Sequence, residues 1–143
     1  MATEITAAVT SFVDTNVWLD AFIEGQDSKK SEKAKRVVQN TSAILVSTQV
    51  INEVCVKLLK ALRLSETDIR DIIMAFYDRY QIMEFNQTIL RIASEFRSRY
   101  QLSFWDSLIA ASAFVGGASV LYTEDMHDGL MIEQRLRVEN PFK

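Results

Sequence analysis

The sequence predicts an α/β fold, a three-layer α/β/α sandwich around a mainly parallel sheet of four to five strands. Strand and helix patterns alternate along the chain without repeats or low-complexity tracts, which is typical of a parallel sheet covered by helices on both faces. The predicted strands are short apolar runs, as expected for strands that are buried on both faces. The chain has 143 residues and no linker, so we expect one domain over residues 1–143.

The predicted strands are bounded by polar, turn-forming residues. Each run is too short for a helix and is followed by Asp, Asn, Ser or Thr, which favour turns and helix caps. In chain order, the strands are one that ends at Phe12-Val13, then Ala43–Val46, Ile82–Phe85, Ser119–Tyr122, and a short fifth strand within Leu130–Val138.

The predicted helices begin at capping residues, and some end at glycine. Ser65 and Asp68 form a capping box, and the helix of residues 28–40 has an exposed basic face. In chain order, the helices are Val17–Glu24 ending near Gly25, Ser28–Asn40, one capped by Ser47 or Thr48 that runs to about Leu64, one from Ser65 to near Arg79, one capped by Asn86 that runs to about Tyr100, and one capped by Ser103 that ends at Gly116-Gly117.

Composition excludes several classes of protein. The single cysteine, Cys55, excludes an internal disulfide and a cysteine zinc cage, and fits a reducing compartment, so we expect a cytoplasmic protein. Residues 1–10 lack the features of a signal peptide. The uncharged segment Ser107–Tyr122 is shorter than the ~20 residues of a membrane span and contains two glycines, so we expect no membrane association. With a net charge of −3, binding to nucleic acid must be local or metal-mediated.

Two acidic residues lie at the carboxyl ends of predicted strands. Asp14 follows Phe12-Val13, and Asp125 follows the run Ser119–Tyr122. In an open α/β sheet, ligands bind in the crevice beyond the carboxyl ends of the strands, so both acids are site candidates. Taken alone, each is better explained as a residue that forms a turn or caps a helix.

A third acid, Glu53, lies on the helix that follows the second strand. On a helical wheel it stands beside the apolar stripe, with Lys57 and Lys60 on the same adjoining face. One interpretation is an ordinary surface pair of Glu and Lys four residues apart. The other is an acid that faces the crevice, with both lysines aligned to contact phosphates.

A fourth acid, Asp106, opens a helix that is apolar nearly all round. Ser103 and Asp106 have the spacing of a capping box, which explains the acid without a function. The apolar sequence that follows indicates a helix enclosed by protein, which places Asp106 close to the core. An ionised carboxylate in such a place is costly unless hydrogen bonds or a cation compensate its charge.

The combination of the four acids suggests a metal site. Four carboxylates at one edge of a sheet repel each other, which raises some of their pKa values unless divalent cations bind. Oxygen ligands without histidine or thiol favour Mg²⁺ or Mn²⁺. Such ions activate water and neutralise the charge of a phosphodiester during hydrolysis. His127 is the only histidine, which is too few for a zinc hydrolase, and the chain has no glycine-rich loop that binds phosphates.

Five segments of the chain form an ordered set: FVDTNVWLDAF, INEV, FWDSLIAASA, VLYTEDMHDG and ENPF. Together, from Phe12 to Phe142, they resemble the PIN domain, and in particular the VapC-type toxin ribonucleases of toxin-antitoxin pairs. The resemblance implies a Mg²⁺-dependent endoribonuclease that forms a homodimer and is inhibited by a partner antitoxin. By the same resemblance, the residues of the acidic site are Asp14, Glu53, Asp106 and Asp125.

The resemblance also implies roles for residues around the acids. Asp14 would be the central metal ligand, with Asp106 and Asp125 beside it and Glu53 binding the metal or orienting water. Thr123 matches a Ser or Thr near the metal, and Asp128 matches an additional acid of some members. We expect Thr15 and Asn16 to orient the ligands. Lys57 and Lys60 are the candidates for contacts to the RNA backbone, ahead of a weaker set: Lys29, Lys30, Lys33 and Arg36.

Two alternatives remain at this point. One is a noncatalytic domain that keeps the fold and binds RNA or protein. The other is an Asp-based phosphoacceptor or phosphatase, in which Asp14 at a strand end receives a phosphoryl group over Mg²⁺. The second alternative is the weaker, because Asn16 stands where the phosphatase pattern has a second acid.

Overall fold

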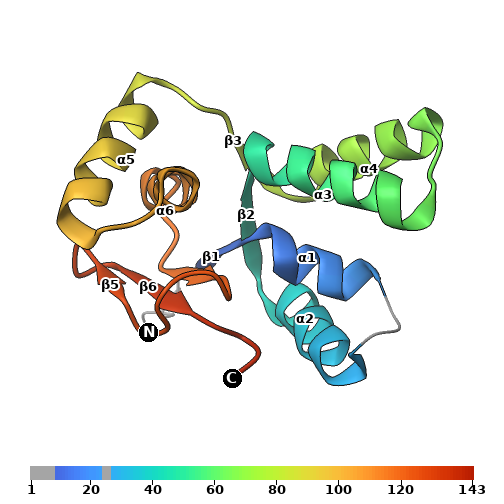
Figure 1. The fold of residues 1–143 in the computed structure, drawn as a ribbon, viewed down its shortest axis with the longest axis horizontal. Helices are drawn as coiled ribbons and strands as arrows, with labels where there is room; N and C mark the ends of the chain where they lie inside the picture. Colours follow the sequence, from blue (N-terminus) through green and yellow to red (C-terminus); the bar gives the residue numbers. More distant parts are fainter. Residues whose placement is uncertain (1–8, 24–26) are drawn as a thin grey trace, which may run out of the picture.

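Short runs of β-branched, aliphatic and aromatic residues form a six-stranded sheet in the computed structural model, which describes residues 9–23 and 27–143 (Figure 1). These residue types favour strands because their side chains pack well on a pleated surface. The strands are β1 (Thr10–Val13), β2 (Ala43–Ser47), β3 (Gln81–Met83), β4 (Val120–Tyr122), β5 (Met131–Ile132) and β6 (Leu136–Glu139).

The order of the strands is β3-β2-β1-β4-β6-β5, and all neighbours are parallel except β5, which is antiparallel to β6. At the centre, Phe12 on β1 is in register with Leu45 on β2 and Leu121 on β4. All three side chains are fully buried. Because β1, β2 and β4 are parallel, their carboxyl ends share one edge of the sheet.

Six helices are present among the described residues, and each begins at a side chain that accepts backbone hydrogen bonds. The predicted caps Asn86 and Ser103 are confirmed, and Ser65 forms the predicted capping box with Asp68. Of the two residues expected to cap α3, Ser47 is the cap. The helices are α1 (Thr15–Phe22), α2 (Ser28–Asn40), α3 (Thr48–Leu62), α4 (Glu66–Arg79), α5 (Gln87–Tyr100) and α6 (Phe104–Val115).

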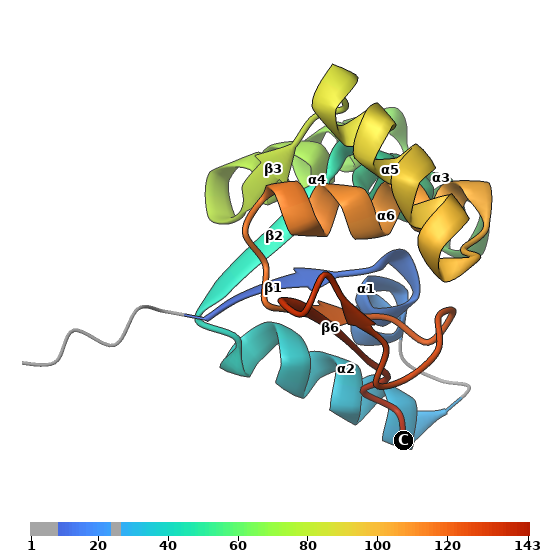
Figure 2. The same ribbon diagram turned by 90° about the vertical axis from the view of Figure 1, so that its left-hand side faces the viewer.

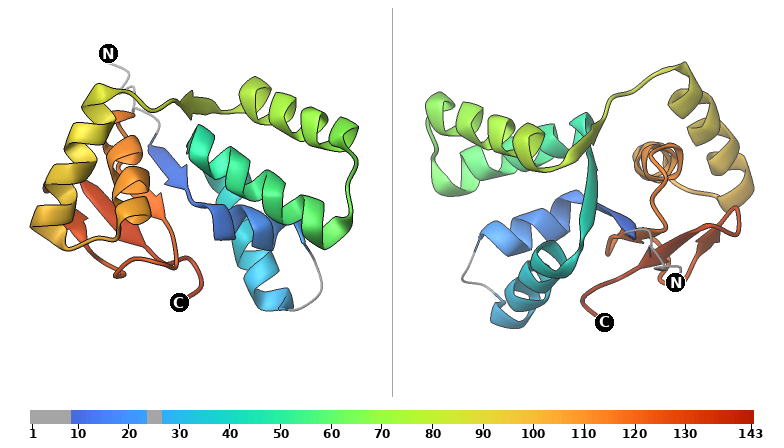
Figure 3. Two further views of the ribbon diagram at one scale, coloured as in Figure 1. Left: turned by 45° about the horizontal axis from the view of Figure 1, so that its top comes forward. Right: turned by 180° about the vertical axis from the view of Figure 1, so that it is seen from behind.

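The helices lie on both faces of the sheet. Figure 2 shows α5 and α6 on one side of the strands and α2 on the other, with α1 beside α2. The helices α3 and α4 pack against each other and extend from the end of β2, as Figure 3 shows. Residues 107–113 of α6 are all buried, so the prediction of an enclosed helix is confirmed. The predicted α/β fold with a mainly parallel sheet is therefore correct.

The C-terminal part of the sheet differs from the prediction. The run Leu130–Val138 was expected to give one short strand, and it forms two, β5 and β6, which brings the sheet to six strands. The chain reverses between them at Glu133 and Gln134, which have φ angles of 51° and 56°. Two consecutive left-handed residues form a tight reversal, and neither is a glycine that would have marked it in the sequence.

The first helix also begins earlier than expected, at Thr15 instead of Val17, because Asp14 is its N-cap. Its predicted end, at Glu24 and Gly25, lies outside the described residues. None of the helices in the described ranges combines the length and the apolar character needed to span a lipid bilayer.

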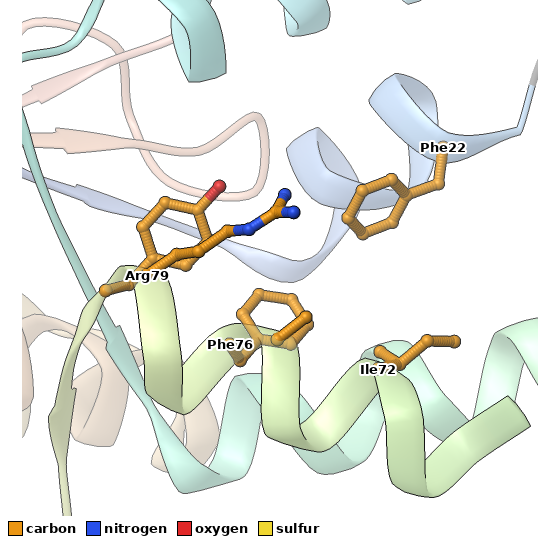
Figure 4. A pocket seen from close by; sticks show the side chains of 6 residues that line it. Phe22, Ile72, Phe76 and Arg79 are labelled. Carbon is orange, nitrogen blue, oxygen red and sulfur yellow. The ribbon is translucent and has the colours of Figure 1, made fainter. Parts of the chain in front are cut away.

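An aromatic cluster joins α1 to α4. The ring of Trp18 lies 5.0 Å from that of Phe76 and 5.8 Å from that of Phe22. Trp18 and Phe76 are buried, whereas the side chain of Phe22 is exposed. Phe22, Phe76 and Arg79 line a small apolar pocket between these helices, with Ile72 beside them (Figure 4). The cluster therefore holds the α3–α4 pair against α1.

Candidate active site

All four predicted acids line one pocket of about 110 Å³ at the carboxyl edge of the sheet. Asp14 directly follows β1, and Asp125 lies in the loop after β4. Glu53 is on α3, the helix that follows β2, and Asp106 is in the first turn of α6. The predicted convergence of the four carboxylates is therefore present in the structure.

Asp14 is the most buried of these acids, with a relative exposure of 5%. Its Oδ1 accepts a hydrogen bond from the backbone N–H of Thr15 at 2.7 Å, and its Oδ2 accepts one from the Thr123 hydroxyl at 2.8 Å. Burial, together with the smaller effect of the charges of Asp125 and Glu53, raises the pKa of Asp14 to about 6, and the two hydrogen bonds partly oppose this rise. Asp14 is thus both a helix cap and a perturbed acid, and perturbed acids concentrate at functional sites.

Glu53 is held in place by hydrogen bonds from two sides. The hydroxyl of Thr15 donates to its Oε2 at 2.7 Å, and the side-chain amide of Gln49 donates to its Oε1 at 3.0 Å. The side chain is half-buried and lines the pocket, so of the two interpretations of Glu53 the structure supports the acid that faces the crevice.

Asp106 and Asp125 complete the acidic lining. Burial raises the pKa of Asp106, and the negative charges of Asp125 and Glu53 add to this rise, while hydrogen bonding with Ser103 opposes it. The amide of Asn16 lies 3.3 Å from Oδ2 of Asp125, to which it donates. The four acids thus repel each other across a shared space.

The residues predicted to support the acids fall into two groups. Thr15, Asn16 and Thr123 donate hydrogen bonds to Glu53, Asp125 and Asp14. Asp128 does not contact them: its Oδ1 accepts a hydrogen bond from the backbone N–H of Asn140 at 2.8 Å, which ties the loop after β4 to the chain end.

The predicted basic residues are also divided. Both Lys57 and Lys60 are exposed, but only Lys57 is among the residues that line the pocket. On α2, Lys30 forms an ion pair with Glu124 at 2.8 Å, and Lys33 donates to the backbone oxygen of Phe142. These two lysines thus hold the loop after β4 and the C-terminal residues.

Sequence reasoning missed three residues of the pocket: Gln49, Trp105 and Ile109. Gln49 lies one helical turn before Glu53, and Trp105 directly precedes Asp106, so their positions next to predicted acids were a usable signal. Ile109 lies one turn after Trp105 on an apolar helix, and nothing in its local sequence distinguishes it from core residues.

The donor set of the pocket fits a hard divalent cation. All four acids offer oxygen atoms, and the amide oxygen of Gln49 is buried without a hydrogen-bond partner among the described residues. Among the described residues that line the pocket, Lys57 is the only cation. As they are placed, no three Asp, Glu, His or Cys side chains within residues 9–23 and 27–143 form a group that could hold a metal ion. The fit therefore rests on the chemistry of the donors and on their uncompensated charge.

Comparison with protein families gives a match to the PIN domain over residues 11–127. The chain belongs to the PIN domain family. The matched range contains all four acids of the pocket, so the resemblance seen in the sequence is confirmed. PIN domains of the VapC type are ribonucleases, and the family is generally metal-dependent. A comparison with curated protein sequences gave no significant match.

Solved structures with the same fold include toxins of toxin-antitoxin complexes. One chain of a toxin-antitoxin complex from Klebsiella pneumoniae is 23% identical, with a TM-score of 0.69 over 92% of the present chain and 97% of that chain. VapC20 from Mycobacterium tuberculosis, described as a toxin that cleaves the sarcin-ricin loop, is 20% identical, with a TM-score of 0.64 over 80% and 89%. DNA-bound VapBC from Salmonella typhimurium is 18% identical, with a TM-score of 0.64 over 93% and 98%.

Proposed function

We propose that this PIN domain is a Mg²⁺-dependent endoribonuclease that hydrolyses RNA phosphodiester bonds, and that it is the toxin of a toxin-antitoxin pair. The observation that carries the proposal is the convergence of four carboxylates around the buried Asp14 in one pocket. Such a cluster is electrostatically unfavourable by itself, and a divalent cation would compensate it.

In this proposal Asp14, Asp106, Asp125 and Glu53 hold the metal, and Mn²⁺ substitutes for Mg²⁺. When bound, the cation polarises the phosphate and lowers the pKa of a water molecule. Thr15 holds the carboxylate of Glu53 toward the pocket, where Glu53 binds the metal or orients the attacking water. Thr123 orients Asp14, and Asn16 orients Asp125.

The basic side chain at the pocket has a separate role. Lys57 lies on α3 one turn after Glu53 and lines the same pocket. We expect its ammonium group to contact a phosphate of the RNA backbone, because the protein's net charge of −3 gives no general attraction for nucleic acid.

The test is cleavage of total RNA with and without Mg²⁺. We expect cleavage by the wild type in Mg²⁺, and loss of it in Asp14→Asn and Asp106→Asn variants that keep their circular dichroism spectra. The matched control is Asp71→Asn, which changes an exposed acid on α4 and should leave cleavage unchanged. Cleavage that persists undiminished in EDTA would falsify the proposal.

Metal binding has a readout that does not depend on activity. A ligand that binds only the native state stabilises it, by about 2.7 kcal/mol at a concentration 100 times its Kd. We therefore expect millimolar Mn²⁺ to raise the melting temperature of the wild type and to have a smaller effect on Asp14→Asn. An unchanged melting temperature for the wild type contradicts the metal site.

The proposed partners are an antitoxin protein and a second copy of this chain. Support comes from the solved structures with the same fold, which include a toxin-antitoxin complex and VapBC bound to DNA. Light scattering after size-exclusion chromatography should give the mass of a homodimer. Co-expression with a candidate antitoxin should give a complex that lacks ribonuclease activity, whereas an unchanged activity argues against that partner.

A noncatalytic PIN domain that binds RNA or protein is the second candidate. The observation that favours it is that no three of the described acids are placed as a metal-binding group. The two candidates differ in one measurement, because a noncatalytic domain saturated with Mg²⁺ binds RNA and leaves it intact.

A further inference from the structure

The two tryptophans of this chain have opposite environments. Trp18 is fully buried in the aromatic cluster, and its indole N–H donates to the backbone oxygen of Val13 at 2.9 Å. Trp105 has a relative exposure of 62%, and its indole N–H donates no hydrogen bond to another described residue. Packing of the core therefore accounts for Trp18 and does not account for Trp105.

Trp105 stands at the rim of the acidic pocket. It directly precedes Asp106 in the first turn of α6, and it lines the pocket together with the four acids and Lys57. A large flat apolar side chain beside carboxylates contributes nothing to metal binding. Metal binding therefore does not account for a tryptophan at this pocket.

A second aromatic ring continues this surface. Phe104, with a relative exposure of 57%, meets Trp105 edge to face, with 5.6 Å between ring centroids. The guanidinium of Arg97 lies 4.1 Å from the centre of the Phe104 ring and also donates to the Ser107 hydroxyl at 2.7 Å. Two exposed rings, Phe104 and Trp105, thus lie in contact with each other, with the half-buried Arg97 against Phe104 and with Trp105 at the pocket.

We infer that Trp105 is the stacking platform for a base of single-stranded RNA next to the phosphodiester that is cleaved. Aromatic side chains beside a cation are typical of surfaces that bind single-stranded nucleic acid, because every base has a face that stacks. An unpaired base is required, because the bases of a duplex are stacked on each other. The inference rests on the proposed ribonuclease function and adds the residue that positions a base of the substrate.

The first test measures binding without cleavage. Because Trp18 is buried, the accessible tryptophan fluorescence comes from Trp105. In EDTA, a single-stranded RNA oligonucleotide should quench this fluorescence, and a ribose-phosphate oligomer of the same length without bases should not. Trp105→Phe provides the blank, because only the signal of Trp18 is left. Equal quenching by both oligomers, or none by the RNA, overturns the inference.

The second test measures cleavage in Mg²⁺. Loss of a stacked base corresponds to a decrease in kcat/KM of between about fivefold and about a hundredfold for Trp105→Ala. Trp105→Phe should keep most of the activity, because a phenyl ring also stacks. The control is Leu90→Ala, which removes a comparably exposed apolar side chain on α5. Wild-type activity in Trp105→Ala overturns the inference.

A thermodynamic cycle identifies the contact itself. Removing one base beside the mapped cleavage position should slow cleavage by the wild type and have little further effect on Trp105→Ala, because both changes remove the same contact. If the effects of removing a base and of Trp105→Ala are additive at every position near the cleavage point, Trp105 does not stack a base and the inference is wrong. A Trp105→Ala variant that loses activity together with its dimeric mass also overturns the inference, because Trp105 is then a contact between copies. If the wild type cleaves no RNA in Mg²⁺, the proposed function fails, and the fluorescence test still decides whether Trp105 stacks a base.

Discussion

The hydroxyl of Thr123 lies 2.8 Å from Oδ2 of Asp14 and joins two residues that are 109 positions apart in the sequence. Each residue directly follows a strand, and the two strands, β4 and β1, are parallel neighbours. The same hydroxyl accepts a hydrogen bond from the backbone N–H of Asp125 at 3.2 Å. Thr123 therefore connects two of the acids in the pocket.

Thr123→Val should weaken metal binding and RNA cleavage, because it keeps the shape of the side chain and removes the hydrogen bond to Asp14. Groups that orient metal ligands typically contribute about 10- to 100-fold to metal affinity or activity. Calorimetric titration with Mn²⁺ and the cleavage rate in Mg²⁺ measure the effect. Thr123→Ser keeps the hydroxyl and should stay close to the wild type. Equal affinities for Mn²⁺ in the valine variant and the wild type would show that the bond does not position Asp14.

The raised pKa of Asp14 predicts a pH-dependent stability in the absence of metal. Its carboxyl has a pKa of about 6 in the folded protein and an ordinary value of 3.8. Between these values the folded state binds more protons than the unfolded state, so the free energy of unfolding falls as the pH rises from about 4 to about 6. The loss from this group is about 3 kcal/mol, and it is absent below pH 4, where both states are protonated.

Urea unfolding in EDTA at pH 4 to 7 measures this effect, with Asp14→Asn as the reference that cannot titrate. We expect the wild type to lose stability relative to Asp14→Asn across this range. Because a metal requires the ionised carboxylate, the affinity for Mn²⁺ should also fall as the pH drops below about 6. A constant stability difference between the two proteins from pH 4 to 7 would contradict the perturbed pKa.

Lys57 and Lys60 form a matched pair for testing contacts to RNA. Both are exposed lysines on α3, but only Lys57 lines the pocket. Lys57→Ala should weaken RNA binding and reduce the slope of log K against log salt by about 0.7, the value for one contact to a single strand. Lys60→Ala should have a smaller effect on both quantities. Fluorescence anisotropy in EDTA at several salt concentrations measures both the RNA affinity and its salt dependence. Equal effects of the two variants would show that the position of Lys57 at the pocket does not matter for RNA binding.

Asp128 should contribute to stability rather than to catalysis. Its carboxylate accepts a hydrogen bond from the N–H of Asn140 and lies outside the pocket lining. Hydrogen bonds to charged groups contribute about 1.5–3 kcal/mol, so Asp128→Ala should lower the free energy of unfolding by an amount in this range. Asp128→Asn keeps an acceptor oxygen and should lose less. A severe loss of cleavage in a folded Asp128→Ala variant would instead show that Asp128 has a role in catalysis.

Local patterns predicted most of the fold. The N-caps Ser65, Asn86 and Ser103 were predicted correctly, and Ser47 is one of the two residues predicted for α3, because a cap depends on residues within one helical turn. The reversal at Glu133 and Gln134 was missed, because neither residue is typical of left-handed backbone. Its formation depends on the pairing of β5 with β6.

The sequence by itself determined that Asp14 and Asp125 follow strands at the carboxyl edge of the sheet and that Asp106 opens a buried helix, because these properties follow from the apolar runs near them. The tertiary structure decided what each acid contacts. The bonds of Thr15 to Glu53 and of Thr123 to Asp14 join residues 38 and 109 positions apart. The tertiary structure also placed Lys57 and Trp105 at the pocket and left Lys60 outside its lining. Such outcomes depend on how the helices pack on the sheet, and packing involves contacts between segments far apart in the chain.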